Sequence, residues 1–451
     1  MIPPLFLLAP PPIANPLVGR SVEVDPGFGY YAARSPESVA RELEVNGCKV
    51  VRYVVTNDED VDDKLIAAFH SRGIAVWYCT FTNGFYGDPK GLPAGWESWK
   101  QVLYKPTDYG YTFLSLSSPE YMAWKSAKVV ATLEQHAFDA VDLVEPFQVN
   151  WGGPDDGGYG DLSVPALAEF SKTTGNPQPP EFGDAASPRY WKTNKALYQS
   201  WVDFRAKAVT DFLTTVCNSI RKAGVKKPIC VWALANTPPT ANQDPVALAR
   251  EWQGVDAGDI AAKAKPDLVC FQTNWPDWST PDLPADYVLR YKPFVDQLRK
   301  VSKVPFIVQA DTGSNADTRR SRQWIADFEK ACAKLGAVGT TAYSYEISLW
   351  LFTEAPEVRQ VEVNGDDVLL VFQKRLDNAS AEDLSHYAFS GGLSVTRAAC
   401  DGNLVRLTVS GLKPGTWSLK IDGVKDDVSH LGFKDHQPNV CTQTVKVVVR
   451  G

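Results

Sequence analysis

Eight short apolar runs, separated by segments with helical periodicity, constrain the fold of this chain more than any other feature. The runs predict strands at 21–27, 49–55, 74–81, 140–147, 228–235, 267–274, 304–311 and 337–345. Helices are predicted between them at 35–47, 60–73, 118–136, 188–223, 245–264, 284–300 and 318–334. Most of the runs are apolar throughout rather than alternating, which is typical of strands that are buried on both faces. The pattern therefore predicts an α/β fold, a closed (β/α)8 TIM barrel rather than an open doubly wound sheet.

Two further segments flank the predicted barrel, which we place at residues 20–354. Residues 1–19 contain six prolines within their first 16 positions and are interpreted as a Pro-rich arm or the remnant of a leader. Residues 355–451 change to short alternating runs broken by turn signals such as NGDD and DGN, which predicts a small all-β sandwich.

The sequence argues against several classes of function. The net charge of -7 argues against a nucleic-acid partner, and no apolar window is long enough to span a membrane. No glycine-rich nucleotide fingerprint follows any predicted strand, and no CxxC pair is present. Cys400 and Cys441 both lie in the C-terminal segment and could form a disulfide if the protein is exported. The sequence leaves the oligomeric state open.

The functional site of such a barrel lies at the carboxyl ends of the strands and in the loops that follow them. Asp25, Tyr86 and Gln309 are among the side chains there. The residues that we predict to bind substrate are Arg52, Asn83, Trp99, Gln148, Asn150, Trp151, Trp232, Gln272, Asn274, Trp275, Asp277, Tyr343 and Tyr345. The long segments 82–117 and 150–188 are interpreted either as capping subdomains with their own aromatic cores or as walls of a cleft.

Apart from Arg52, these residues have aromatic, amide and carboxylate side chains, a set that suits the binding of a sugar. Aromatic faces stack on pyranose rings, while amides and carboxylates bind hydroxyl groups. Only His70 and His136 fall in the barrel, and both are predicted on the face opposite the site. This placement argues against catalysis by histidine or by His-bound zinc and favours a pair of carboxylates as the catalytic groups. No cofactor or metal is expected.

Glu145 is the first candidate for catalysis, because it ends a predicted strand and is followed directly by Pro146. Asp311 and Glu346 compete for the role of second carboxylate, with Asp277 third. Asp311 could instead cap the next helix. Asp142 is interpreted as a charge buried between strand and helix.

The stretch FDAVDLVEPF at 138–147 resembles the fourth strand of (β/α)8 glycoside hydrolases, in particular the large retaining clan whose acid/base Glu follows that strand. The resemblance implies that Glu145 is the acid/base and that the nucleophile follows strand seven, at Asp311. The chain has Val144 where the clan has Asn, and Asp311 where the clan has Glu.

The tail phrase NLVRLTVSGLKPGTWSLKIDGVKD resembles the immunoglobulin-like modules of secreted bacterial enzymes, which implies a secreted or periplasmic protein. The sequence thus predicts a bacterial glycosidase that degrades a poly- or oligosaccharide. Two alternatives remain open, a non-catalytic carbohydrate-binding barrel and a polysaccharide lyase.

Overall fold

The computed structural model describes residues 15, 17–56, 60–86, 90–106, 110–150, 152–238, 240, 242–312, 316–343, 351–429 and 436–450. Most of the predicted N-terminal arm, together with Trp151, Tyr345 and Glu346, lies outside these residues.

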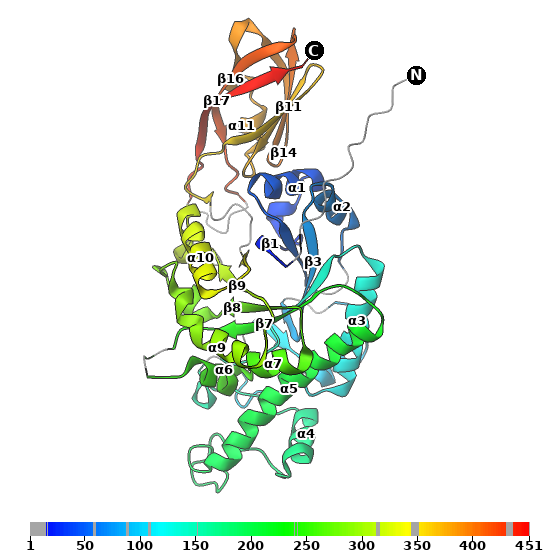
Figure 1. The fold of residues 1–451 in the computed structure, drawn as a ribbon, viewed down its shortest axis with the longest axis vertical. Coiled ribbons are helices and arrows are strands. Elements are labelled where there is room, and N and C mark those ends of the chain that lie inside the picture. The colour runs from blue at the N-terminus through cyan, green and yellow to red at the C-terminus, as the bar shows by residue number, and fades with distance from the viewer. Residues whose placement is uncertain are drawn as a thin grey trace.

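Eight parallel strands form a closed barrel, which confirms the predicted fold class (Figure 1). The strands are β1 (Gly19–Val24), β2 (Val50–Val55), β3 (Ala75–Phe81), β6 (Ala140–Val144), β7 (Ile229–Ala235), β8 (Leu268–Thr273), β9 (Phe306–Asp311) and β10 (Gly339–Tyr343). Strand β1 pairs with both β2 and β10, and the pairing of Gly19 with Gly339 closes the ring.

Helices cover the outside of the barrel, as the alternation predicted. They are α1 (Pro36–Val45), α2 (Asp63–Ser71), α3 (Pro119–Gln135), α5 (Lys195–Lys222), α6 (Pro245–Gln253), α7 (Ala257–Ala264), α9 (Lys292–Val301) and α10 (Arg322–Leu335). The single helix predicted at 245–264 is two helices, because Gly254 adopts φ 69° and ends α6. No helix in the described part of the chain is long and apolar enough to cross a bilayer.

The inside of the barrel is a packed core that contains one buried ion pair. Its apolar members include Val50, Trp77, Cys230 and Ile307. Asp142 lies on the inward face of β6 and pairs with Arg52 of β2, so it is buried as predicted but inside the barrel rather than between strand and helix. The reason is the alternation of β6, in which Ala140 and Val144 also point inward.

The two long segments that follow the third and fourth barrel strands contain short strands and helices of their own. The first holds a hairpin of β4 (Gly84–Tyr86) and β5 (Tyr111–Phe113) and the 3-10 helix Trp96–Trp99. The second holds the 3-10 helix Pro154–Asp156 and α4 (Val164–Thr174), which pack with the N-terminal part of α5 around Tyr159, Phe170, Phe182, Trp201 and Phe204. This second excursion therefore has the separate aromatic core that one interpretation predicted.

Residues after the barrel form two antiparallel sheets around a second core. One sheet has the order β11 (Val358–Asn364), β12 (Asp367–Phe372), β15 (Leu404–Ser410), β14 (Ser394–Asp401). The other has the order β13 (Tyr387–Phe389), β16 (Gly415–Lys425), β17 (Val440–Val449), and α11 (Asn378–Glu382) joins them. Cys400 on β14 and Cys441 on β17 are free thiols on different sheets.

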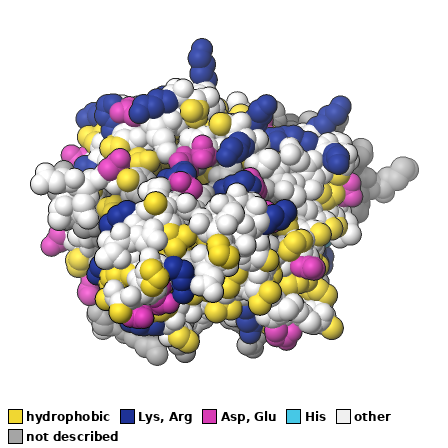
Figure 2. Space-filling model, turned by 90° about the horizontal axis from the view of Figure 1, so that it is seen from below, with side chains coloured by type: hydrophobic (Ala, Val, Ile, Leu, Met, Phe, Trp, Pro, Cys, Tyr) yellow, Lys and Arg dark blue, Asp and Glu magenta, His cyan; other side chains and the backbone are white. Residues whose placement is uncertain are grey.

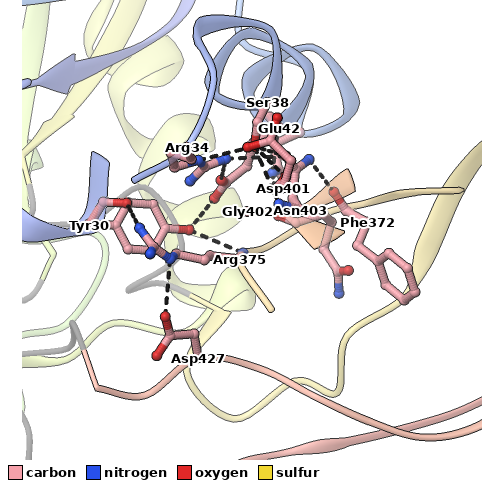
Figure 3. Close-up of polar contacts among 12 residues, drawn as sticks. Tyr30, Arg34, Ser38, Glu42, Phe372, Arg375, Asp401, Gly402, Asn403 and Asp427 are labelled. Carbon is pink, nitrogen blue, oxygen red and sulfur yellow. Dashed lines mark hydrogen bonds and ion pairs between the residues drawn. The ribbon is translucent and has the colours of Figure 1, made fainter. Parts of the chain in front are cut away.

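A polar interface joins these sheets to the barrel (Figure 3). The Arg34 guanidinium donates to Asn403 Oδ1 of the C-terminal sheets at 3.1 Å. It also lies 2.8 Å from the Glu42 carboxylate of the barrel, and the side chains of Arg34 and Glu42 are fully inaccessible to solvent. The Ser35 backbone N–H donates to Asp401 Oδ1 at 2.8 Å, and the Ser38 hydroxyl donates to Asn403 Oδ1 at 2.9 Å. The β14–β15 turn is thereby bound to the N-terminus of α1.

Candidate active site

A cleft of about 1440 Å³ opens at the carboxyl ends of the barrel strands. This is the end at which barrels of this class carry their sites. The predicted site residues that line it are Glu145, Asp311, Trp232, Gln272, Asn274, Trp275 and Tyr343. All eight strands contribute at least one of their own residues to the lining, through Glu23, Tyr53, Phe81, Val144, Trp232, Gln272, Asp311 and Tyr343. The cleft therefore draws on residues from every strand of the barrel.

Glu145 is held at the cleft by an unusual backbone conformation. Its φ of 55° lies in the left-handed region, which non-glycine residues rarely adopt and which costs about 1–2 kcal/mol. The Tyr86 hydroxyl donates to Glu145 Oε2, and Gln272 Nε2 donates to Glu145 Oε1 at 2.9 Å. The side chain is therefore fixed from two sides, by the β4 strand and by β8.

The pKa of Glu145 is raised above its ordinary value because the carboxyl group is desolvated. The hydrogen bonds from Tyr86 and Gln272 act in the opposite direction, since they stabilise the carboxylate. A carboxyl group with a raised pKa can retain its proton near neutral pH and donate it, which is what a general acid requires.

Asp311 and Glu23 are two further carboxyl groups of the cleft, only 6% and 7% exposed. Asp311 ends β9, as the sequence predicted. Glu23 lies one residue before the end of β1, and Thr341 Oγ1 is 3.4 Å from its Oε1. Burial raises the pKa of Glu23 well above its ordinary value, and the charges of Asp142, Asp311 and Glu145 raise it further, against the attraction of Arg52.

Sequence reasoning missed Glu23 because it considered residues at and after the strand ends, whereas Glu23 lies within a strand. A signal was present in the alternation of β1, where Ser21 and Glu23 share one face and Val22 and Val24 share the other. Polar residues at every second position of a barrel strand indicate a face that points into the barrel.

Aromatic side chains form much of the remaining wall, at Phe28, Tyr53, Phe81, Phe85, Tyr111, Phe147 and Trp278. Tyr86 and Trp275 are 37% and 47% exposed. Within the described residues they are the only aromatic side chains among the exposed large hydrophobic residues, and both line the cleft. Exposing an aromatic ring is costly, so finding both at the cleft marks a surface suited to a flat apolar ligand face.

The other described residues predicted to bind substrate do not line the cleft. Arg52 lies beneath it, where it pairs with Asp142. Asp277 is buried and accepts hydrogen bonds from the Thr237 backbone N–H at 2.7 Å and the Tyr291 hydroxyl at 2.8 Å. Trp99 packs on Tyr121 and Trp124. The three remaining amide side chains, those of Asn83, Gln148 and Asn150, are also buried. Asn83 and Asn150 form hydrogen bonds with backbone groups of neighbouring loops.

The two histidines of the barrel form hydrogen bonds outside the cleft. His70 Nε2 lies 2.9 Å from the Asp139 carboxylate, just before β6, and His136 Nδ1 lies 3.0 Å from Asp63 at the start of α2. His70 lies in the last turn of α2 and His136 directly follows α3, so both are at helix ends that precede strands, and neither lines the cleft. Among the described residues no three His, Cys, Asp or Glu side chains are grouped so that they could hold a metal ion.

No protein-family model matches the chain, and no curated protein matches its sequence. Among solved structures, it is similar to the glycoside hydrolase domain of PgaB (BpsB) from Bordetella bronchiseptica, with a TM-score of 0.54, 15% identity, and coverage of 72% of this chain and 94% of that one. It is also similar to the β-galactosidase of Bacillus circulans sp. alkalophilus, with a TM-score of 0.51, 13% identity, and coverage of 73% of this chain and 50% of the other. The chain thus spans about half of that β-galactosidase. At these identities the likeness concerns the fold, which is a (β/α)8 barrel of the kind found in glycoside hydrolases.

Proposed function

We propose that this protein is a glycoside hydrolase that cleaves a poly- or oligosaccharide in the cleft, with Glu145 as general acid/base. The observation that carries the proposal is the placement of Glu145. A strained backbone directs it into an aromatic cleft, two hydrogen bonds fix it, and desolvation raises its pKa. Strain of this kind persists where the surrounding structure requires it, and it is concentrated at active sites.

In the proposed reaction Glu145 protonates the oxygen of the leaving sugar as the glycosidic bond breaks. Asp311 acts on the opposite face of the sugar ring, either as nucleophile or as the base that activates water. Glu346, which lies outside the described residues, is the competing second carboxylate. Measurement of the anomeric configuration of the first product decides the role, since retention requires a nucleophile and inversion requires a base.

The size of the cleft supports an extended saccharide as its ligand, and its charge argues against a polysaccharide lyase. At about 1440 Å³ it exceeds the roughly 300–1,000 Å³ of typical small-molecule pockets, which favours a chain of several sugars. A polysaccharide lyase acts on acidic sugars, which favour a basic cleft, whereas Lys90 is the one Lys or Arg among the described residues that line this cleft.

The test is hydrolysis of a panel of polysaccharides by the wild-type protein, E145Q, D311N and E346Q. We expect E145Q to lose at least about 100-fold in kcat, the scale of general acid catalysis, and to keep its affinity for glycan. The control is E169Q, which changes a Glu on the surface of α4 far from the cleft lining. Glycan binding without turnover by the wild-type protein would establish the non-catalytic barrel instead.

A further inference from the structure

Part of the cleft wall is a short segment between β8 and α9 that consists of α8 (Trp275–Trp278) and the three residues after it. Trp275 and Trp278 of this α8 segment (residues 275–281) line the cleft, and Asp311 lines it from the end of β9. The α8 segment is helix and turn rather than strand, so its position relative to Asp311 depends on contacts outside the barrel sheet.

Arg320 connects the α8 segment with the end of β9. Its backbone N–H donates to the carbonyl oxygen of Thr312, the residue after Asp311, at 3.2 Å. Its guanidinium donates to three backbone carbonyl oxygens of the α8 segment, those of Trp278 at 3.3 Å, Thr280 at 2.8 Å and Pro281. A single residue therefore spans the distance between the proposed second carboxylate and the aromatic wall.

The Arg320 side chain is itself fixed by packing against α10. It is only 3% exposed, and its guanidinium lies over the Trp324 ring, 5.3 Å from the ring centroid. Trp324 Nε1 donates to the Leu283 carbonyl oxygen at 2.8 Å, just beyond the α8 segment. A planar guanidinium presents several donors in a rigid fork, which suits it to hold several carbonyl oxygens at once, whereas the ammonium group of a lysine is a single point.

The positive charge of Arg320 is buried without a carboxylate partner. Within the described residues no carboxylate is close enough to form an ion pair with it, and its Nε has no hydrogen-bond partner there. Burial lowers the pKa of the guanidinium, against the charges of Tyr287, Asp311 and Asp282, which raise it. A buried charge without an opposite charge in contact is unfavourable, so its presence beside the cleft calls for a role there.

We infer that Arg320 is a positioning residue of the cleft, which holds the α8 segment in place relative to Asp311 and whose charge keeps Asp311 ionised. The inference rests on the proposed function, in which Asp311 is the second carboxylate. Arg320 does not line the cleft, so it acts through the residues that it holds. A sugar that stacks on Trp275 is thereby presented to the carboxylates in one position, and small displacements from such a position reduce the rate of reaction strongly.

Two variants separate the two effects, measured on the polysaccharide that the wild-type protein cleaves fastest. R320K keeps the charge at acidic pH but cannot span three carbonyl oxygens, so KM should rise at least about threefold while the acid limb of the profile of kcat/KM against pH stays in place. R320M removes the charge as well. Its KM should also rise, and its acid limb, where Asp311 loses its proton, should move to higher pH.

The interpretation of the acid limb depends on the other ionisable groups around the pair. Those on neighbouring elements are Glu23, Asp282, Tyr287 and Tyr343, and both variants retain them. R322K and R322M are the matched controls. The Arg322 side chain is 45% exposed, pairs with Glu354 at 3.0 Å and lies outside the cleft lining, so both changes should leave KM and the pH profile as in the wild-type protein.

Hydrogen exchange of the free protein tests the contact without any substrate. Backbone amides of residues 275–283 should exchange faster in R320K than in the wild-type protein and in R322K, and thermal melting shows whether each variant is folded. Unchanged exchange in that segment, or an unchanged KM in both Arg320 variants, overturns the positioning role, and the hydrolase remains. An acid limb that stays in place in R320M overturns the electrostatic role.

The outcomes also distinguish this inference from the proposed function. If the wild-type protein binds a polysaccharide of the panel but cleaves none, the hydrolase fails and the dissociation constant takes the place of KM. Weaker binding by R320K together with faster exchange then supports the positioning of the α8 segment, and binding as tight as that of the wild-type protein overturns it.

Discussion

Glu145 reaches the cleft through its own backbone rather than through the alternation of β6. Val144 points into the barrel, so a regular strand would turn the next side chain outward, toward the helices. The left-handed φ of 55° redirects the chain at that point. The sequence identified Glu145 from its place at a strand end before proline, but no propensity rule predicts a left-handed glutamate, because only the surrounding tertiary structure can stabilise one.

The Tyr86 hydroxyl offers a test of the role of Glu145 at the level of a single atom. Its hydrogen bond stabilises the Glu145 carboxylate and so lowers a pKa that burial raises. Y86F removes this bond and keeps the ring. The pKa of Glu145 should therefore rise further, and the alkaline limb of the profile of kcat/KM against pH, where a general acid loses its proton, should move to higher pH.

Measurement of kcat/KM from about pH 4 to pH 9 on a cleaved glycan checks this expectation. Y190F, which alters a tyrosine outside the cleft lining, is the control and should keep the wild-type profile. A shift of the alkaline limb to lower pH in Y86F would contradict the assignment of Glu145 as the acid.

Strands β2, β6 and β7 meet inside the barrel around one buried charge pair. The Arg52 guanidinium pairs with Asp142 and lies over the Trp77 ring, 4.7 Å from its centroid. Trp232 Nε1 donates to Asp142 Oδ1 at 2.8 Å. The strands themselves could be predicted, because apolar runs of this length carry a local signal. The pairing could not, since it depends on the register of strands whose residues are 90 positions apart. For this reason the sequence alone suggested a substrate role for Arg52.

Removal of one partner of this pair should destabilise the barrel. D142A leaves the buried Arg52 charge without compensation and Trp232 Nε1 without an acceptor, so we expect the free energy of unfolding to fall by about 3–5 kcal/mol. The double variant R52M/D142L removes both charges and should recover much of that loss. Urea denaturation followed by tryptophan fluorescence measures both variants. A double variant less stable than D142A would show that the pair is worth more than its desolvation costs.

At the scale of the whole molecule, the barrel and the C-terminal sheets are joined by charged and polar groups that are buried between them. Besides the contacts at Arg34 and Ser38, Arg41 of α1 binds the partly exposed Glu362 of β11 through two hydrogen bonds. The Arg375 guanidinium lies between the two parts, where its Nη1 donates to the Tyr30 carbonyl oxygen and its Nε donates to Asp427 Oδ2 at 3.0 Å (Figure 3). Such groups satisfy one another only in one relative position of the two parts. On the end of the molecule seen in Figure 2, by contrast, basic, acidic and hydrophobic side chains are interspersed.

The turn between β14 and β15 permits a test of this interface by a single methyl group. Gly402 has φ 60° and faces α1, where a Cβ atom would collide with the Ser38 hydroxyl and lie 2.6 Å from Arg34 Nε. Gly365, in the β11–β12 turn, has the same φ of 60°, but a Cβ atom there would meet nothing within 4 Å. G402A and G365A therefore share the cost of a left-handed alanine, about 1–2 kcal/mol, and differ only in the collision.

We expect G402A to separate the unfolding of the two parts and G365A to leave it unchanged. Wild-type protein and G365A should melt in one calorimetric transition, because breaking the interface exposes its buried charges and so couples the two cores. In G402A the coupling is weakened, and the C-terminal sheets should melt first, in a transition of their own. Limited proteolysis gives an independent readout, since G402A should be cleaved between the barrel and β11 under conditions that leave G365A intact. If both variants melt in one transition at the same temperature, the turn does not contribute to the coupling, and the two cores depend on each other through other contacts.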